Sequence, residues 1–198
     1  MVVHMHYTIK EMQNQLQLDL KASRYIHTLG VQYTTACLAM CYRENIEKAE
    51  TAGLLHDCAK QLPGEKLLEI CEKHNENLSD VERTNLFLLH GKAGAHIAHE
   101  KFGIKDIDIL NAIRYHTTGR PNMTMLEKMV FVADYIEPNR KDAPNLEFLR
   151  QMAFRDLDQT VYLILEQTLE YLKSTNTDID LNTVVTKNYY YDLLRSKK

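Results

Sequence analysis

Residues 46–60 read IEKAETAGLLHDCAK, and this stretch contains the pattern that decides the fold. At the helical period of 100° per residue, four side chains fall within about 80° of one another: Ile46, Ala49, Gly53 and His56. Such an arc is typical of a helix with one buried face, so we expect a helix over about residues 46–58. His56 and Asp57 stand near its end, and neighbouring side chains can serve one site only where a helix ends.

The composition of the whole chain favours helices throughout. Its 198 residues include 7 Gly and 4 Pro, roughly half of the usual combined share of these two residues. Hydrophobic residues make up 44% and charged residues 26%, which excludes collagen-like, disordered and disulfide-stapled classes. The length predicts one all-α domain over residues 1–198, with a core at about 18–140 and C-terminal helices at about 146–194.

Apolar periodicity and capping signals predict the remaining helices. We expect them at about residues 8–20, 21–42, 63–73, 80–89, 91–102, 106–115, 125–136, 146–173 (with a break near 154–156) and around 184–193. Thr8 and Ser79 each precede a glutamate by three residues, which is the spacing of a capping box. In the helix over 21–42 we expect an apolar stripe to face the core: Ile26, Leu29, Tyr33, Cys37 and Met40.

Charge and cysteine spacing limit the classes of partner and the cellular compartment that we expect. Lys and Arg number 24 and Asp and Glu 27, for a net charge of −3, so the basic excess of DNA or RNA binders is missing. The chain has no run of about 18 apolar residues and no signal-like N-terminus, so we expect no membrane partner and a cytoplasmic location. The four cysteines predict buried, reduced thiols, with Cys37 and Cys41 on one helix face.

Nine histidines stand out, and several lie on inward helix faces. A ligand-type side chain points inward at or near the ends of four helices, with His27 on an inward edge: His27, His56 with Asp57, His90, His116 and Asp134. One such histidine is usually a core residue, but this ordered set on separate helices predicts a metal site. Imidazole with carboxylate suits Fe, Mn, Co, Ni or Zn. We expect His96 and His99, which project opposite the apolar stripe of their helix, to be solvated, and we expect terminal or loop-like polar surroundings for His4, His6 and His74.

Cationic and hydroxyl side chains near these ligands indicate an anionic substrate. Arg24 precedes His27 by one turn, Lys60 follows His56 by one turn, and Arg140 follows Asp134. A loop with hydroxyls and a glycine comes directly after His116: Thr117, Thr118 and Gly119. Because a bound cation activates water and neutralises charge on phosphoryl oxygens, the pattern favours phosphate hydrolysis. Solvated surface cations and a plain glycine turn are the alternative interpretation.

The order of His27, His56-Asp57 and Asp134 resembles the signature of the HD superfamily of metal-dependent phosphohydrolases. More closely, four stretches resemble the YqeK family: LLHDCAK at 54–60, HGKAGA at 90–95, HTTG at 116–119, and MLEK at 125–128 leading into VADYIEPNR at 132–140. The resemblance covers about residues 8–194. It implies a single-domain, all-α HD helical bundle and symmetrical hydrolysis of diadenosine tetraphosphate to two ADP in a cytoplasmic homodimer.

The resemblance also implies roles for individual residues. The metal, iron or else Mn, Co, Ni or Zn, would be held by His27, His56, Asp57 and Asp134, while His90 and His116 would hold a second metal or contact phosphates. Arg24, Lys60, Thr117 and Arg140 would cradle the polyphosphate, with Asp57, His90, His116 and Asp134 also at the substrate. Asp57, Lys60, His90 and His116 would carry the catalysis.

Three other interpretations of the sequence stay open. The chain could be an HD phosphohydrolase that acts on another nucleotide, although no Gly-Tyr-Pro follows the His-Asp pair and no regulatory domain accompanies it. It could instead be a non-catalytic sensor of nucleotide or metal, or a helical scaffold with scattered core histidines.

Overall fold

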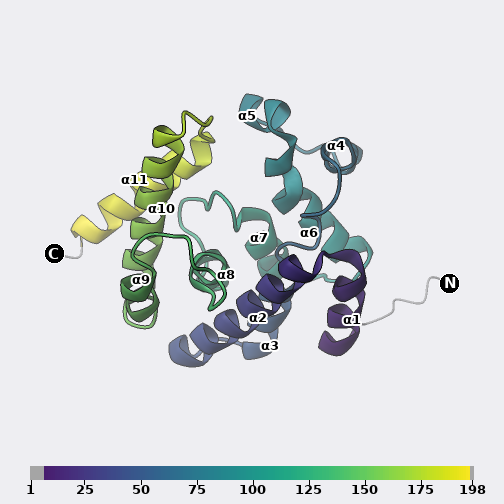
Figure 1. The fold of residues 1–198 in the computed structure, drawn as a ribbon, viewed down its shortest axis with the longest axis horizontal. Helices are drawn as coiled ribbons and strands as arrows, with labels where there is room; N and C mark the ends of the chain where they lie inside the picture. Colours follow the sequence, from purple (N-terminus) through teal and green to yellow (C-terminus); the bar gives the residue numbers. More distant parts are fainter. Residues whose placement is uncertain (1–6, 197–198) are drawn as a thin grey trace.

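The computed structural model describes residues 7–196 (Figure 1); His4 and His6 therefore lie outside the described residues. The chain folds into α1 (Ile9–Asp19), α2 (Ala22–Tyr42), α3 (Ile46–Leu55), α4 (Gly64–Lys73), α5 (Asp80–Thr84), the 3₁₀ helix η1 (Leu86–Leu89), α6 (His90–Glu100), α7 (Ile107–Tyr115), α8 (Met125–Ile136), α9 (Leu146–Ala153), α10 (Leu157–Ser174) and α11 (Leu181–Ser196). No strand occurs within this range, so the predicted all-α class is confirmed.

The helix boundaries follow the capping signals. The capping boxes at Thr8 and Ser79 both form, and a third one forms at Thr124 with Glu127. Each such cap satisfies backbone N–H groups that a helix start leaves unpaired, and is worth about 0.5–2 kcal/mol. The break near residues 154–156 separates α9 from α10. The helix expected over 80–89 is instead divided at Asn85 into α5 and η1, and the one expected to reach Cys58 ends at Leu55.

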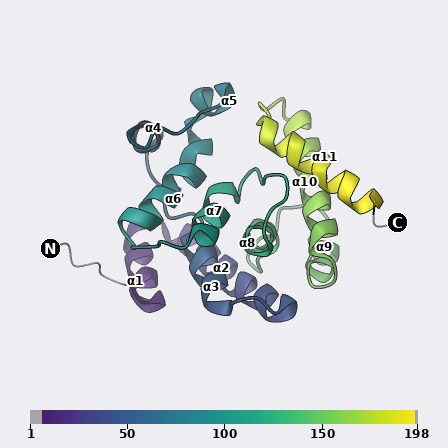
Figure 2. The ribbon, with the colours of Figure 1, turned by 180° about the vertical axis from the view of Figure 1, so that it is seen from behind.

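Helix α8 lies at the middle of the bundle. It packs against α2, α3 and α7 on one side and against α9 and α10 on the other (Figures 1 and 2). The pairs α2–α3, α6–α7 and α10–α11 pack as neighbours. Two apolar clusters result: the main core between these helices, and a smaller one under α4, η1 and α6 around Leu67 and Leu89. Residues that end or start α3, α6 and α7 thus meet α2 and α8.

The stripe expected to bury α2 is wrong. Ile26, Tyr33 and Met40 are 52%, 55% and 57% exposed. The buried face of α2 instead carries residues on the flank of that stripe: His27, Thr28, Val31, Gln32, Thr35, Ala36, Leu38 and Ala39. Two of its polar side chains are hydrogen-bonded: the Thr35 hydroxyl donates to the Val31 carbonyl of the same helix at 2.7 Å, and the Gln32 side-chain oxygen accepts from Nε2 of Gln13 at 2.9 Å. Hydrogen bonding therefore lets a helix face of mixed polarity pack in the core, although apolar periodicity alone favours the more hydrophobic face of α2.

The four cysteines are free, but only two are buried. Cys58 and Cys71 lie in the interior as expected, whereas Cys37 and Cys41 are exposed because they belong to the outward face of α2. Among the described helices, none has the length and apolar character needed to cross a membrane.

Candidate metal centre

Three of the predicted histidines stand at helix ends and are oriented by the backbone. His56 follows α3, His116 follows α7, and His90 begins α6. In each ring Nδ1 faces the carbonyl oxygen three residues earlier, at 2.7 Å for His56, 2.7 Å for His116 and 2.5 Å for His90. Since Nδ1 is engaged in this way, the Nε2 atom of each ring is the one that remains for a ligand.

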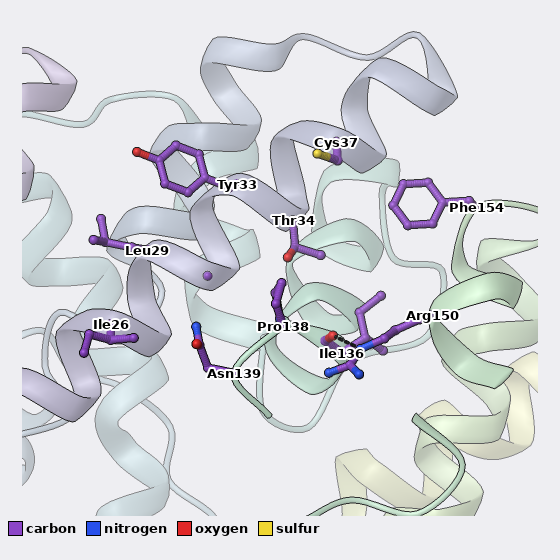
Figure 3. A pocket seen from close by; sticks show the side chains of 11 residues that line it. Ile26, Leu29, Tyr33, Thr34, Cys37, Ile136, Pro138, Asn139, Arg150 and Phe154 are labelled. Carbon is purple, nitrogen blue, oxygen red and sulfur yellow. Dashed lines mark hydrogen bonds between the residues drawn. The ribbon is translucent and has the colours of Figure 1, made fainter. Parts of the chain in front are cut away.

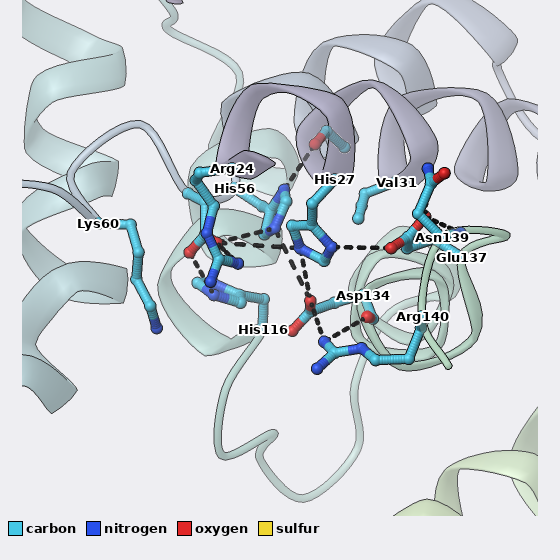
Figure 4. A network of polar contacts seen from close by, with 12 residues as sticks. Arg24, His27, Val31, His56, Lys60, His116, Asp134, Glu137, Asn139 and Arg140 are labelled. Carbon is cyan, nitrogen blue, oxygen red and sulfur yellow. Dashed lines mark hydrogen bonds and ion pairs between the residues drawn. The ribbon is translucent and has the colours of Figure 1, made fainter. Parts of the chain in front are cut away.

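The other members come from α2 and α8. His27 lies within α2, and its Nδ1 is 3.1 Å from Oε1 of Glu137. Its Nε2 is 3.0 Å from Oδ1 of Asp134 in α8 (Figure 4). The turn after α3 carries Asp57, which is 2% exposed. The structure therefore brings together, from five separate helices, the residues that the sequence proposes as ligands.

These side chains form two groups that could each hold a metal ion: His27, His56 and Asp134, and His56, Asp57 and His116. Asp57 extends between them. Its Oδ2 lies 3.5 Å from Nε2 of His56, while its Oδ1 lies 3.4 Å from Nε2 of His90 and 3.5 Å from Nε2 of His116. Nε2 of His90 and Nε2 of His116 are themselves 3.1 Å apart. One carboxylate with its two oxygens aimed at different imidazoles suits a bridge between two cations.

The residues fit a transition metal by a separate criterion. Nε2 of His56 and Oδ1 of Asp57 are buried, and neither has a hydrogen-bond partner in the described chain. Buried polar atoms are normally paired, because an unpaired one costs about 1–3 kcal/mol. These atoms are an imidazole nitrogen and a carboxylate oxygen, and both face the same centre as His27 and Asp134. This donor set is the one that Fe, Mn, Co, Ni and Zn take.

The protonation states also suit cation binding. Burial raises the pKa of Asp57, but the His56 and His116 imidazoles outweigh it and hold that pKa well below its usual range. Asp134 behaves alike: burial raises its pKa, and His27 and His56 lower it by more. For His90, burial and the nearby His116 and Lys60 lower the pKa to about 3. Both carboxylates are thus ionised and His90 is neutral at neutral pH.

Cationic side chains surround the centre as expected. Arg24 Nη1 is 2.9 Å from Oδ2 of Asp57, and Arg140 Nη2 is 3.2 Å from Oδ1 of Asp134. Lys60 Nζ lies 3.1 Å from Nε2 of His90. A cavity of about 380 Å³ opens beside His27 and is lined by Ser23, Arg24, His27, Glu137, Asn139, Arg140, Lys141 and Asp142. An anionic ligand that entered this cavity would meet the cationic side chains of Arg24, Arg140 and Lys141.

The loop after α7 also reaches the centre. Thr117 Oγ1 lies 3.3 Å from Nε2 of His90 and 3.3 Å from Nε2 of His116. Thr118 instead donates to the Gly119 carbonyl at 3.0 Å. Gly119 has φ of +64°, a left-handed conformation that glycine adopts without strain. Thr117 is thus the hydroxyl of this loop that belongs to the site.

Three described histidines lie outside the centre, His74, His96 and His99, and the expectation that His96 is solvated is wrong. His99 is exposed, but His96 is only 18% exposed in its side chain. Its ring stacks on that of His74, with centroids 3.8 Å apart, and its Nε2 is 2.6 Å from Oε1 of Glu76. The negative partner and the stacked ring lie outside α6, so the periodicity of α6 alone does not indicate them.

A second hollow lies on the other flank of α2. This groove of about 680 Å³ (Figure 3) is lined by Ile26, Leu29, Gly30, Tyr33, Thr34, Cys37, Ile136, Pro138, Asn139, Arg150 and Phe154. It contains none of the candidate ligands.

Two residues near the centre, Glu137 and Lys141, were not predicted from the sequence. Glu137 follows Asp134 by three residues and Lys141 follows Arg140 directly, so helical spacing and adjacency were the available signals.

Comparison with known proteins agrees with this arrangement. The model of the HD domain matches residues 24–139. The symmetrical bis(5'-nucleosyl)-tetraphosphatase of Bacillus subtilis (strain 168) is 41% identical over 173 residues, which cover 86% of this chain and 91% of that protein. The protein of the same description from Halalkalibacterium halodurans is 42% identical over 170 residues, covering 85% and 89% respectively.

A solved structure extends the likeness to nearly the whole chain. It is the crystal structure of a predicted HD superfamily hydrolase involved in NAD metabolism from Clostridium acetobutylicum, with a TM-score of 0.92, 41% identity, and coverage of 98% of this chain and 100% of that one. The fold, the site and these similarities lead to one conclusion: the chain belongs to the HD domain family and, within it, to the family of the symmetrical bis(5'-nucleosyl)-tetraphosphatases.

Proposed function

We propose that this protein hydrolyses diadenosine tetraphosphate symmetrically, giving two ADP. The observation that carries the proposal is Asp57, whose two oxygens face imidazoles on opposite sides of a cluster fringed by Arg24, Lys60 and Arg140. The relatives at 41% and 42% identity are named for this activity. A polyphosphate bridge carries several negative charges, and the cationic rim suits such a substrate.

We propose that His27, His56, Asp57 and Asp134 would hold one metal ion, and that His90 and His116 would hold a second one beside Asp57 or contact the phosphates directly. Iron is the metal we favour, with Mn, Co, Ni and Zn as alternatives that the same donors accept. When bound, the metal supplies an activated water and neutralises charge on a phosphoryl oxygen.

The side chains of this chain position the substrate. The water oxygen bonds to one of the two central phosphorus atoms, and the bond from that phosphorus to the central bridging oxygen breaks, so that one ADP leaves and the other gains the new oxygen. Lys60 and Arg140 stabilise the charge on the phosphoryl and leaving oxygens, Arg24 and Thr117 orient the chain of phosphates, and such fixed charges act mainly by electrostatics and positioning. Neutral His90 serves as an acceptor or ligand, since its pKa of about 3 leaves it no proton to give near pH 7.

Two alternative functions use the same geometry, namely hydrolysis of another nucleotide and sensing without turnover. The discriminating experiment is anaerobic purification, metal analysis, reconstitution with Fe²⁺ or Mn²⁺, and incubation with a panel of dinucleoside polyphosphates, mononucleotides and cyclic nucleotides. Our proposal requires diadenosine tetraphosphate to have the highest kcat/KM of the panel. Faster turnover of a mononucleotide would favour the first alternative, and nucleotide binding without any product would favour the second.

We propose further that the protein is a homodimer. Support comes from the outward face of α2, where Ile26, Tyr33 and Met40 are more than half exposed and Phe154 of the neighbouring groove is 42% exposed. Neighbouring large apolar side chains that are exposed together are typical of interaction sites. In sedimentation equilibrium we expect twice the chain mass for the wild type and the chain mass for the Ile26→Asp, Tyr33→Asp double variant. A monomeric wild type would contradict the proposal.

We place the protein in the cytoplasm. The support is its two buried, free cysteines, Cys58 and Cys71, since reduced thiols are the norm in a reducing compartment. Nucleotide substrate and nucleoside diphosphate product are the partners we propose, and we propose no DNA, RNA or membrane partner. Fractionation of cells that express a tagged chain tests the location, and recovery in the membrane fraction would contradict it.

A further inference from the structure

We propose that Glu137 is a positioning residue, which holds the His27 imidazole in the tautomer and the orientation needed to bind a metal ion. The inference rests on the metal centre proposed above. It concerns a residue outside the set of candidate ligands, and it starts from a difference between His27 and the other three histidines of the centre.

His56, His90 and His116 are oriented by backbone carbonyls at helix ends. His27 has no such carbonyl, because it lies inside the continuous helix α2, where backbone carbonyls are engaged in helical hydrogen bonds. Its Nδ1 needs a partner from another element. Glu137, the residue that ends α8, supplies it with Oε1 at 3.1 Å (Figure 4). The Glu137 carboxylate thus orients the His27 ring, as backbone carbonyls orient the other three rings.

Glu137 is itself held in place. Its residue exposure is only 2%, and its second oxygen, Oε2, accepts from the backbone N of Asn139 at 2.7 Å and from Nδ2 of Asn139 at 3.0 Å. A buried carboxylate of this kind has little freedom to turn. Oε1 is therefore presented to His27 by a fixed loop rather than by a mobile side chain.

The packing of α2 is adapted to this carboxylate. Gly30 lies on the turn of α2 after His27, and a Cβ at Gly30 would overlap Oε2 of Glu137 and stand 3.2 Å from Nδ2 of Asn139. Because of this overlap, a side chain at position 30 would force the carboxylate away from His27. The absence of a side chain at Gly30 thus allows α2 to approach Glu137 closely, and this is a second observation that supports the proposal.

The chemical consequence follows from the proton on the imidazole. A carboxylate only accepts, so Glu137 favours the His27 tautomer with the hydrogen on Nδ1, and the Nε2 lone pair of that tautomer is the one that a metal ion beside Asp134 would take. Carboxylate partners of this kind raise the basicity of metal-binding imidazoles, and their loss typically costs about 10–100-fold in metal affinity. Glutamine at position 137 would offer an NH₂ group that stabilises the opposite tautomer.

The test compares Glu137→Gln with the wild type by two measurements that need no turnover. The first is the affinity of the metal-free protein for Mn²⁺, by chelator competition. The second is a long-range ¹H–¹⁵N spectrum of histidine-labelled, metal-free protein at a pH where the imidazoles are neutral, with the His27 signal assigned from a His27→Gln sample. Glu76→Gln is the matched control, because it removes a carboxylate from His96 at 2.6 Å in a cluster away from the centre.

We expect the Mn²⁺ affinity of Glu137→Gln to fall by about 10–100-fold, the His27 spectrum to lose its Nδ1–H pattern, and Glu76→Gln to match the wild type in both. Mn²⁺ binding within twofold of the wild type, with the Nδ1–H pattern intact, would overturn the inference. If Glu137→Gln does not fold, the exposed Asn139→Ala variant replaces it: a smaller loss of affinity is expected and unchanged affinity would overturn the inference. A wild-type protein that binds no Mn²⁺, Fe²⁺ or Zn²⁺ would instead refute the metal centre itself.

Discussion

Nε2 of His27 lies 3.0 Å from Oδ1 of Asp134, which joins the second helix of the chain to the eighth. This contact closes a ring of side chains that also contains His56 and Asp57, since Nε2 of His56 lies 3.5 Å from Oδ2 of Asp57 and 3.9 Å from Oδ1 of Asp134. The bundle thus converts residues far apart in sequence into one compact set of nitrogen and oxygen donors.

Replacing Asp57 by alanine should abolish both metal binding and turnover. The change removes both oxygens that face the imidazoles and leaves no carboxylate between the two candidate metal positions. Metal content per chain, by elemental analysis after reconstitution, should fall well below that of the wild type, with activity lost in parallel. A variant with full metal content and full activity would rule out the assignment of Asp57.

Lys60→Ala should slow hydrolysis without releasing the metal. Lys60 is placed next to His90 but is not among the candidate ligands, so its loss should lower kcat/KM by about 10–100-fold through weaker stabilisation of phosphoryl charge. Lys66→Ala is the matched control, because this exposed lysine pairs with Glu69 of the same helix and lies outside the candidate centre. Equal kinetics for both variants would remove Lys60 from the substrate site.

Much of this centre could be predicted from the sequence, for a physical reason. His56 and His116 end helices and His90 begins one, and helical period together with capping signals locates such ends. The face of α2 could not be predicted, because Thr35 and Gln32 are buried through hydrogen bonds while Ile26 and Tyr33 are exposed. Hydrophobicity alone favours the opposite orientation. The role of Glu137 could not be predicted, because it depends on the contact with His27 that the packing of α2 on α8 creates.

Glu76 should make stability depend on acid pH. Burial raises its pKa, but hydrogen bonds with Arg114 and His96 outweigh burial, so the folded-state pKa lies below the ordinary value of 4.5. A depressed carboxyl pKa contributes stability above the unfolded pKa and loses it as the pH falls through the folded pKa. The advantage of the wild type over Glu76→Gln in urea denaturation should therefore be full near pH 7 and shrink below about pH 4.5. An advantage that stays constant down to pH 3 would contradict this assignment.

Thiol labelling should divide the four cysteines into two pairs. Burial raises the pKa of Cys58 to about 12 and that of Cys71 to about 11, so both stay protonated and covered at pH 8. Cys37 and Cys41 are exposed on α2. In the monomeric Ile26→Asp, Tyr33→Asp variant, where the outward face of α2 is free, a disulfide reagent such as dithiobis-nitrobenzoate should modify two thiols per chain quickly in the native state and four after denaturation. Rapid reaction of a third thiol in the native state would show that Cys58 or Cys71 is accessible.

The most direct test of the central claim is the identity of the products formed from diadenosine tetraphosphate. Metal-loaded wild-type protein would be incubated with this substrate in H₂¹⁸O and the nucleotides separated by ion exchange and weighed by mass spectrometry. The account predicts ADP as the sole product, with one ¹⁸O atom for every two ADP molecules formed. AMP together with ATP, or no turnover by a protein that holds its metal, would contradict it.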